Sequence, residues 1–326
     1  MIKINFCDFW PGFEANNLFL RFLKQHFPVF IDDKPDYLFY SVYGKRHLEY
    51  DNCIKILYTG ENLVPDFNLC DYAIGFHYLD FGDRYMRFPL YAYYQWHYDS
   101  VFMDQSLQLS ITNEYDSLAN RKFCNFVYSN NVNSDPIRDV FFHKLCKYKK
   151  VDSGGRHLNN IGVAVKDKLQ FIKDYKFTIA FENSAVPGYT TEKLIEPILV
   201  KSLPIYFGNP LLSLDFEPDS LVLVECRDEL DQVIDQIMNL DKDDDQYLAI
   251  LKKNKFRSDN SLVIWEQKLK VFLENIFKQS LPTAIRRASY GFNSFYTEEI
   301  QLQAKLLLEK KGKDSRKARI KKILSH

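Results

Sequence analysis

Short apolar runs of strand length alternate with helical stretches in the first part of the chain. Apolar residues recur at helical spacing over Leu18–His26, whereas the neighbouring runs are short and close on polar or glycine residues. This alternation is typical of an α/β fold with a parallel sheet. The predicted strands read KINFC, DYLFYSV, IKILYTG and DYAIGF.

A second series of the same kind begins near residue 119, so the pattern predicts two Rossmann-like halves joined around Ser110–Arg121. After Cys226 the pattern is helical, and these helices either close the second domain or cross back over the first. We predict domains over residues 1–118 and 119–280, followed by a tail over residues 281–326. The second series consists of strand KFCNFVYSN, helices over Pro136–Tyr148 and Lys166–Tyr175, strand KFTIAFEN, a helix from Thr190 or Thr191, and strands LPIYFG and SLVLVEC.

The composition excludes some partners. The chain has 326 residues, enough for two domains, and its 43 Lys and Arg residues equal its 43 Asp and Glu residues. With no net charge, no overall field draws the molecule to nucleic acid. The six cysteines lack metal-ligand spacing, which favours a reduced compartment. The first residues show no basic leader, and no apolar run is long enough to span a bilayer, so we expect a cytoplasmic protein.

The end of the chain is different, because LLLEKKGKDSRKARIKKILSH carries many more basic than acidic residues. Its apolar residues recur at helical spacing. The pattern predicts a basic amphipathic helix from about Lys305 to Leu324 that binds an anionic membrane surface. A disordered tail that only improves solubility is the alternative.

One helix is predicted to begin with a cation. Lys193 follows Thr190, Thr191 and Glu192, and the threonines are good N-cap residues. Glu192 suits the positive end of the helix dipole, but a lysine there costs about 0.3–1 kcal/mol. A bound phosphate would compensate, because backbone N–H groups and the lysine would converge on one anion. The alternative is a solvated lysine on the surface.

The place of this helix start favours a ligand site. A right-handed βαβ connection puts the loop Asn183–Tyr189 at the carboxyl end of strand Lys176–Glu182, where open α/β sheets bind ligands. Pro197 lies inside the predicted helix and should kink or shorten it.

A second predicted helix begins in the same way. Asp135 is a candidate N-cap, Pro136 suits the first helical position, and Arg138 then lies in the first turn. Two cations at two helix starts in the same half of the chain favour a diphosphate site over an ordinary surface arginine.

Several other chemistries lack their motifs. Neither G-x-G-x-x-G nor G-x-x-x-x-G-K-[ST] occurs after a strand, which removes the main signals of dinucleotide dehydrogenases and P-loop phosphotransferases. The acidic run Asp241–Asp245 lies between two helical patterns, where a solvated turn is a better interpretation than a metal site. The histidines show no zinc-site spacing. We therefore expect no metal.

One acidic residue follows a strand in the first half. The strand Ile54–Tyr58 breaks at Thr59 and Gly60, which leaves Glu61 and Asn62 at its carboxyl end. This is a position for a group that faces a cleft between domains. The alternative is a loop glutamate with its side chain in water.

Two long stretches carry a resemblance to a known family. One stretch resembles the donor-binding motif of the bacterial α-1,3/4-fucosyltransferases and reads YKFTIAFENSAVPGYTTEKLIEPILVKSLPIYFGNP. The other is similar to the segment that carries the proposed catalytic base of those enzymes and reads YTGENLVPDFNLCDYAIGFHYLDFGDRYMRFPLY. The resemblance covers most of residues 50–225. Pro197 departs from the usual helix, and the tail lacks the leucine-containing heptad repeats of some members.

The resemblance implies a GT-B architecture, in which two Rossmann-like domains face each other across a cleft and the second holds most of GDP-fucose. It implies that Glu61 is the general base and that Lys193 and Arg138 neutralise the leaving GDP without a metal or another cofactor. Glu192 would bond a donor hydroxyl or offset the positive charge of the fucosyl group. The donor-binding residues that it implies are Arg138, Asn183, Tyr189, Glu192 and Lys193.

The implied activity is inverting transfer of L-fucose to O3 of GlcNAc or Glc in a β-galactoside such as N-acetyllactosamine or lactose, which gives Lewis-x-type glycans. Two alternatives stay open at this point. One is a GT-B glycosyltransferase that uses another sugar nucleotide. The other is a non-catalytic adaptor that binds membrane or nucleic acid through the basic tail, which is its best support.

Overall fold

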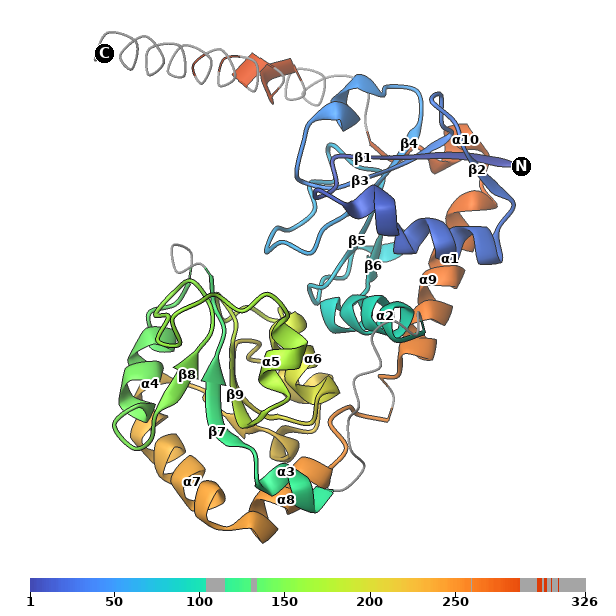
Figure 1. Ribbon diagram of the computed structural model, residues 1–326. Helices are drawn as coiled ribbons and strands as arrows, with labels where there is room; N and C mark the ends of the chain where they lie inside the picture. The colour runs from blue at the N-terminus through green and yellow to red at the C-terminus, as the bar shows by residue number, and fades with distance from the viewer. Residues whose placement is uncertain are drawn as a thin grey trace, which may run out of the picture. The chain divides into compact units, whose positions relative to one another are not determined.

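The computed structural model describes residues 1–103, 115–129, 134–258 and 260–287, and residues 298–300, 302, 303, 306 and 310 of the tail. Contacts divide the chain into two compact units (Figure 1). The first unit holds residues 1–74 and 81–86 and the described residues from 272 onward, and the second holds 75–80 and the described residues of 87–271. The helices after Cys226 thus contribute to both units. The domain boundaries after residues 118 and 280 stay a prediction.

Six strands, counted among the described residues, form the sheet of the first unit. They are β1 (Ile2–Cys7), β2 (Val29–Ile31), β3 (Tyr37–Tyr40), β4 (Ile54–Tyr58), β5 (Tyr72–Gly75) and β6 (Tyr85–Arg87). Their order is β2-β1-β3-β4-β5-β6, and every neighbouring pair from β2 to β5 is parallel. The loops after β1, β3 and β4 therefore share the carboxyl edge of this sheet.

Helix α1 (Leu18–His26) has the bounds that the sequence predicts. The Asn17 side chain accepts a hydrogen bond from the Leu20 N–H at 2.8 Å, which satisfies one unpaired donor of the first turn. The buried face presents Leu18, Phe19, Phe22 and Leu23, the spacing of an amphipathic helix. Burial of each such side chain contributes about 1.5–3 kcal/mol, which explains why the helix stays docked on its unit.

Buried Asp71, just before β5, holds the segment after α10 in the first unit. Its carboxylate accepts the backbone N–H groups of Arg286 at 2.8 Å and Arg287 at 2.9 Å, and that of Lys55 at 2.7 Å. The Arg287 guanidinium pairs with the same carboxylate, which is fully buried. We call this arrangement the Asp71 clasp. A buried charge with four donors is fully satisfied, whereas loss of the donors would leave it strongly unfavourable.

The described residues of the second unit form a five-stranded parallel sheet. Its strands are β7 (Lys122–Phe126), β8 (Val151–Ser153), β9 (Tyr175–Phe181), β10 (Leu203–Phe207) and β11 (Val222–Leu223), in the order β11-β10-β9-β7-β8. Every residue of the central strand β9 is buried, as expected for a parallel strand covered on both faces. Both sheets agree with the predicted α/β class.

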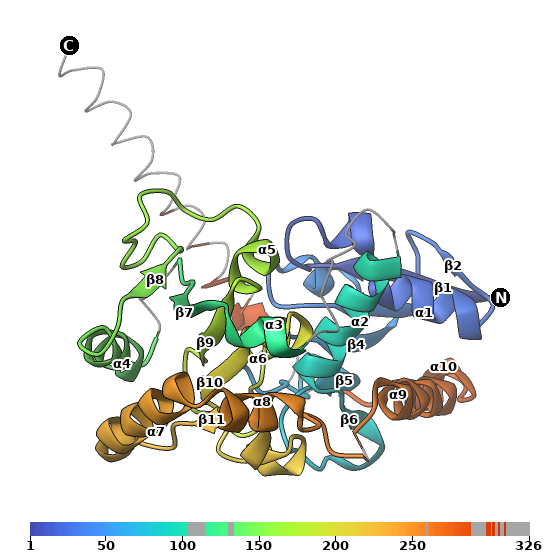
Figure 2. The same ribbon diagram turned by 60° about the horizontal axis from the view of Figure 1, so that its bottom comes forward.

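Helices cover both faces of the second sheet. Figure 1 shows α4 and α7 on one face and α5 and α6 on the other, and Figure 2 again places α4 beside α7. The core between these layers is rich in phenylalanine, including Phe126, Phe141, Phe177 and Phe181. The helices of this unit are α2 (Leu90–Met103), α3 (Tyr115–Ala119), α4 (Ile137–Leu145), α5 (Lys168–Ile172), α6 (Glu192–Leu199), α7 (Leu230–Lys242) and α8 (Asp244–Lys252). Helix α9 (Leu262–Phe277) runs from the second unit into the first, and α10 (Leu281–Ala284) belongs to the first.

Three sequence-based expectations need correction or fall outside the structure. Helix α5 is much shorter than Lys166–Tyr175, and Tyr175 already belongs to β9. The acidic run does not form an entirely solvated turn, because the Asp241 side chain is only 5% exposed and accepts a hydrogen bond from Tyr148. The tail helix predicted from about Lys305 to Leu324 lies almost wholly outside the described residues.

Candidate functional site

Helix α6 begins where the sequence places it. Thr191 is the N-cap, and its side chain accepts from the Lys193 backbone N–H at 3.4 Å. Glu192 and Lys193 therefore lie in the first turn, at the carboxyl end of β9. Pro197 interrupts the backbone hydrogen bonding within the helix, which spans only eight residues.

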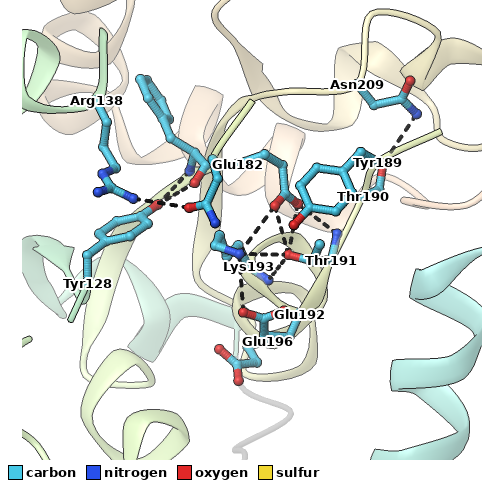
Figure 3. Close-up of polar contacts among 12 residues, drawn as sticks. Tyr128, Arg138, Glu182, Tyr189, Thr190, Thr191, Glu192, Lys193, Glu196 and Asn209 are labelled. Carbon is cyan, nitrogen blue, oxygen red and sulfur yellow. Dashed lines mark hydrogen bonds and ion pairs between the residues drawn. The ribbon is translucent and has the colours of Figure 1, made fainter. Parts of the chain in front are cut away.

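The positive charge of Lys193 is balanced by a carboxylate of the chain itself, from a residue that the sequence analysis did not predict (Figure 3). Glu182 directly follows β9 and is completely buried. Its carboxylate lies 3.4 Å from the Lys193 Nζ atom, and Glu192 lies 3.3 Å from the same atom. Glu182 also accepts the Thr191 backbone N–H at 2.7 Å and its hydroxyl at 2.8 Å. One carboxylate thus fixes both the N-cap and the lysine of α6.

The charges of this cluster shift one another's pKa values. Burial raises the pKa of Glu182, and Lys193 only partly offsets this effect. Burial opposes the charged form of Lys193 too, but Glu182 and Glu192 outweigh it and raise the pKa of the lysine. Although burial disfavours its charge, Lys193 and Lys168 hold the pKa of Glu192 at about 2. Lys193 and Glu192 are therefore both charged at neutral pH.

Arg138 is a buried residue, which rules out an ordinary surface arginine. It lies in the first turn of α4, and its side chain is 1% exposed. The guanidinium donates to Ser134 at 2.7 Å and to the Asn183 side chain at 3.4 Å. Burial lowers the pKa of Arg138, but the ordinary value is so high that the side chain keeps its charge. The N-cap of α4 is Pro136 rather than the predicted Asp135, and Pro136 precedes the first helical position; the Asp135 carboxylate still accepts the Ile137 N–H at 2.9 Å.

Tyr128 contacts Arg138, and the charge of Lys193 also acts on its hydroxyl. The Arg138 guanidinium lies 4.2 Å from the centre of the Tyr128 ring. Burial raises the pKa of the Tyr128 hydroxyl, while the charges of Lys193 and Arg138 act in the opposite direction. That hydroxyl is itself fixed by the Phe181 backbone N–H, which donates to it at 2.6 Å. Both helix-start cations therefore act on the pKa of one buried tyrosine, which lies two residues after β7 and whose hydroxyl contacts the last residue of β9.

The loop before α6 is held in an unusual conformation that needs glycine. Gly188 has a φ of 85°, and a Cβ atom there would lie 2.5 Å from the Phe76 carbonyl oxygen. Its N–H donates to the Asn209 side chain at 2.8 Å. The next residue, Tyr189, is 7% exposed and packs against Phe76 with ring centres 5.3 Å apart. A cavity of about 290 Å³ opens beside this loop, lined by residues including Ala185, Gly208, Asn209 and Glu225.

Glu61 belongs to the first unit, whereas this cluster belongs to the second. It is exposed and follows the carboxyl end of β4, as predicted. Its backbone N–H donates to the Thr59 hydroxyl at 3.0 Å, and its carboxylate accepts a hydrogen bond from Tyr43. Among the predicted site residues, the second unit thus brings Arg138 to Asn183 and Lys193 to Glu192, and Tyr189 lies in the loop before α6. Glu61 comes from the first unit.

Comparison with known proteins decides the family. The model of the alpha-(1,3)-fucosyltransferase FucT N-terminal domain matches residues 4–94, and that of the glycosyltransferase family 10 (fucosyltransferase) C-terminal domain matches residues 117–276. A crystal structure of an alpha1,3-fucosyltransferase with GDP-fucose is 30% identical, with a TM-score of 0.72 over 88% of this chain and 93% of that one. The chain belongs to the alpha-1,3-fucosyltransferases of glycosyltransferase family 10.

A second solved structure and a curated relative are also similar. A crystal structure of an alpha1,3-fucosyltransferase with GDP is 31% identical, with a TM-score of 0.70 over 84% of this chain and 90% of that one. The alpha-(1,3)-fucosyltransferase FucT of Helicobacter pylori is 34% identical over 289 residues, or 78% of this chain and 60% of that protein. The chain therefore spans about three-fifths of the length of this relative. The match to the fucosyltransferase structures confirms the predicted GT-B-like fold.

Among the described residues, no group of three or more His, Cys, Asp and Glu side chains could hold a metal ion. None of the helices described is long and apolar enough to cross a bilayer.

Proposed function

We propose that the chain is an inverting fucosyltransferase that transfers L-fucose from GDP-fucose to a β-galactoside, at O3 of GlcNAc or Glc. The main support is a pair of cations in the first turns of two helices, the buried Arg138 and the partly buried Lys193, near the carboxyl edge of a parallel sheet. Such an edge is where α/β folds bind nucleotides. Family membership supplies the donor, since a related structure was determined with GDP-fucose.

In this proposal the two cations bind the diphosphate. Arg138 and Lys193 are charged before the donor arrives, and their positions are fixed by Asn183, Ser134 and Glu182. They would stabilise the charge that develops on GDP as the glycosidic bond breaks. The first-turn N–H groups of α6 would add to this, because helix N-termini favour anions. Asn183 and Tyr189 would complete the donor site.

The carboxylates take the other roles. Glu192 is ionised, because its pKa is about 2, so it can accept a hydrogen bond from a donor hydroxyl or offset positive charge on the fucosyl group. Glu61 would accept the proton of the acceptor hydroxyl as that oxygen attacks the anomeric carbon. Attack on the face opposite GDP inverts the configuration at that carbon.

Incubation of the protein with GDP-fucose and a panel of type 1 and type 2 acceptors, followed by NMR of the product, tests the proposal. We expect an α-1,3 linkage on N-acetyllactosamine or lactose. A parallel panel of other sugar nucleotides tests the donor. Faster transfer of another sugar would replace GDP-fucose in the proposal, and no transfer from any donor would refute it.

We expect turnover to survive chelation, because Arg138 and Lys193 take the place that a divalent ion has in many glycosyltransferases. An excess of EDTA removes bound divalent ions. Fucose transfer in excess EDTA should therefore match transfer without chelator. Loss of activity that manganese restores would show that the reaction needs a metal.

We further propose that the tail binds an anionic membrane surface and keeps the enzyme on the cytoplasmic face, near its glycan acceptors. The support is the excess of Lys and Arg from Lys305 to Leu324. Cosedimentation with anionic vesicles should retain the full chain and lose a chain that ends at residue 304. Equal partition of the two proteins would reject the proposal, and both should transfer fucose to soluble acceptors.

A further inference from the structure

A hub at the end of β1 shapes the carboxyl edge of the first sheet. The Asp8 carboxylate accepts the backbone N–H groups of Arg46 at 3.0 Å and His47 at 2.8 Å, and it contacts the His47 ring at 2.7 Å. The Asp8 carbonyl accepts the Tyr43 N–H at 2.9 Å. Gly44 makes this close approach possible, because a Cβ atom there would lie 2.2 Å from the Asp8 carboxylate. The loop after β3 is therefore fixed against the end of β1.

The hub places one aromatic side chain beside the proposed base. Tyr43 is 49% exposed, and its hydroxyl donates a hydrogen bond to the Glu61 carboxylate. The two residues come from different loops, since Tyr43 follows β3 and Glu61 follows β4. This contact holds the carboxylate in one orientation while half of the tyrosine surface faces solvent.

More aromatic rings continue from Tyr43. Trp10 meets it edge to face, with ring centres 6.1 Å apart, and lies 5.0 Å from Phe13. Phe13 in turn stacks on Phe9 at 3.8 Å. A cavity of about 430 Å³ lies beside these rings, and its lining residues include Phe9, Trp10, Phe13 and Arg46. We call Tyr43 and Trp10, with the cavity that Trp10 lines, the aromatic wall.

A saccharide fits this surface chemically. A pyranose ring has an apolar C–H face and a rim of hydroxyl groups, so it suits a site of aromatic side chains with a few polar groups. Tyrosine offers an apolar ring and a polar tip in one side chain. Here the polar tip is joined to the carboxylate that would take the proton from the acceptor.

We propose that Tyr43 is a positioning and specificity-determining residue for the acceptor, whose sugar packs on the aromatic wall while the Tyr43 hydroxyl holds Glu61 toward the reacting oxygen. This inference rests on the proposed function, because it needs a saccharide acceptor and Glu61 as the base. It assigns two separable effects to one side chain. The hydroxyl acts on turnover through Glu61, and the ring acts on acceptor binding.

Two substitutions separate these effects. Tyr43→Phe keeps the ring and removes the hydroxyl, so kcat should fall about tenfold while the acceptor KM changes little. Tyr43→Leu removes the ring as well, so the acceptor KM should also rise about tenfold. The KM for GDP-fucose should stay near the wild-type value in both. Tyr50→Phe, a half-buried tyrosine of the same unit, is the matched control and should behave as the wild type.

A double-mutant cycle tests the link to Glu61. In a Glu61→Gln background, Tyr43→Phe should have almost no further effect on kcat, because the two residues act as one unit. A full tenfold loss in that background would overturn the positioning role. Wild-type kinetics in both Tyr43 variants would overturn the whole inference while leaving fucose transfer intact. Failure of the wild type to transfer fucose would overturn the proposed function and this inference together.

Discussion

Replacement of Glu61 with glutamine should lower kcat for fucose transfer by about 10²–10⁴-fold, the usual contribution of a positioned base. Glutamine keeps the shape of the side chain but accepts no proton. Donor binding should change little, because Glu61 lies in the first unit and the cations proposed to bind the diphosphate lie in the second. Steady-state kinetics, with calorimetric titration of GDP, measures both quantities.

Glu49→Gln is a matched control, because Glu49 is an exposed glutamate of the same unit. Near-normal kcat in the Glu61 variant would place the base elsewhere. A selective loss of GDP-fucose affinity would instead assign Glu61 to the donor site.

Removal of either helix-start cation should weaken GDP binding by about 10–100-fold, because each is expected to make a charge-assisted contact with phosphate. Arg138→Ala and Lys193→Ala test this by calorimetric titration with GDP. Lys147→Ala, which removes an exposed lysine of the same unit, should bind as the wild type does. Unchanged affinity in both cation variants would refute the diphosphate assignment.

Lys193→Ala needs a companion variant. The substitution leaves the Glu182 carboxylate buried without its lysine, and loss of a buried partner can cost about 3–5 kcal/mol of stability. Glu182→Gln combined with Lys193→Ala removes both charges and retains polar atoms to pair with Thr191. If the double variant is folded, as thermal unfolding would show, weak GDP binding reports the missing cation rather than a disrupted helix start.

The sequence predicted the positions of the two helix-start cations but not their partners. Lys193 and Arg138 could be found because N-cap residues and helical periodicity are local signals, readable within a few residues. Glu182 has no such signal. It ends a buried strand, and only the fold brings its carboxylate to the first turn of α6. Burial of Arg138 was equally hidden, since a first-turn arginine reads the same whether it is solvated or enclosed.

The same limit explains what was missed in the first unit. Glu61 was recognisable at the end of a predicted strand, but its hydrogen bond with Tyr43 joins loops 18 positions apart. The Asp71 clasp spans 216 positions, far beyond any periodic pattern. Strands and helices follow from alternation along the chain, whereas contacts between loops follow from the register of the sheet.

The Asp71 clasp has a consequence for biosynthesis. A ribosome delivers Arg286 and Arg287 only 215 and 216 positions after Asp71. Until then the buried carboxylate lacks three of its four donors, so the first unit cannot reach its final packing. The second unit, which ends at Val271, is complete before those arginines exist. Domains usually fold in the order of their synthesis. In this chain the first unit begins to be synthesised before the second unit but completes its folding after it.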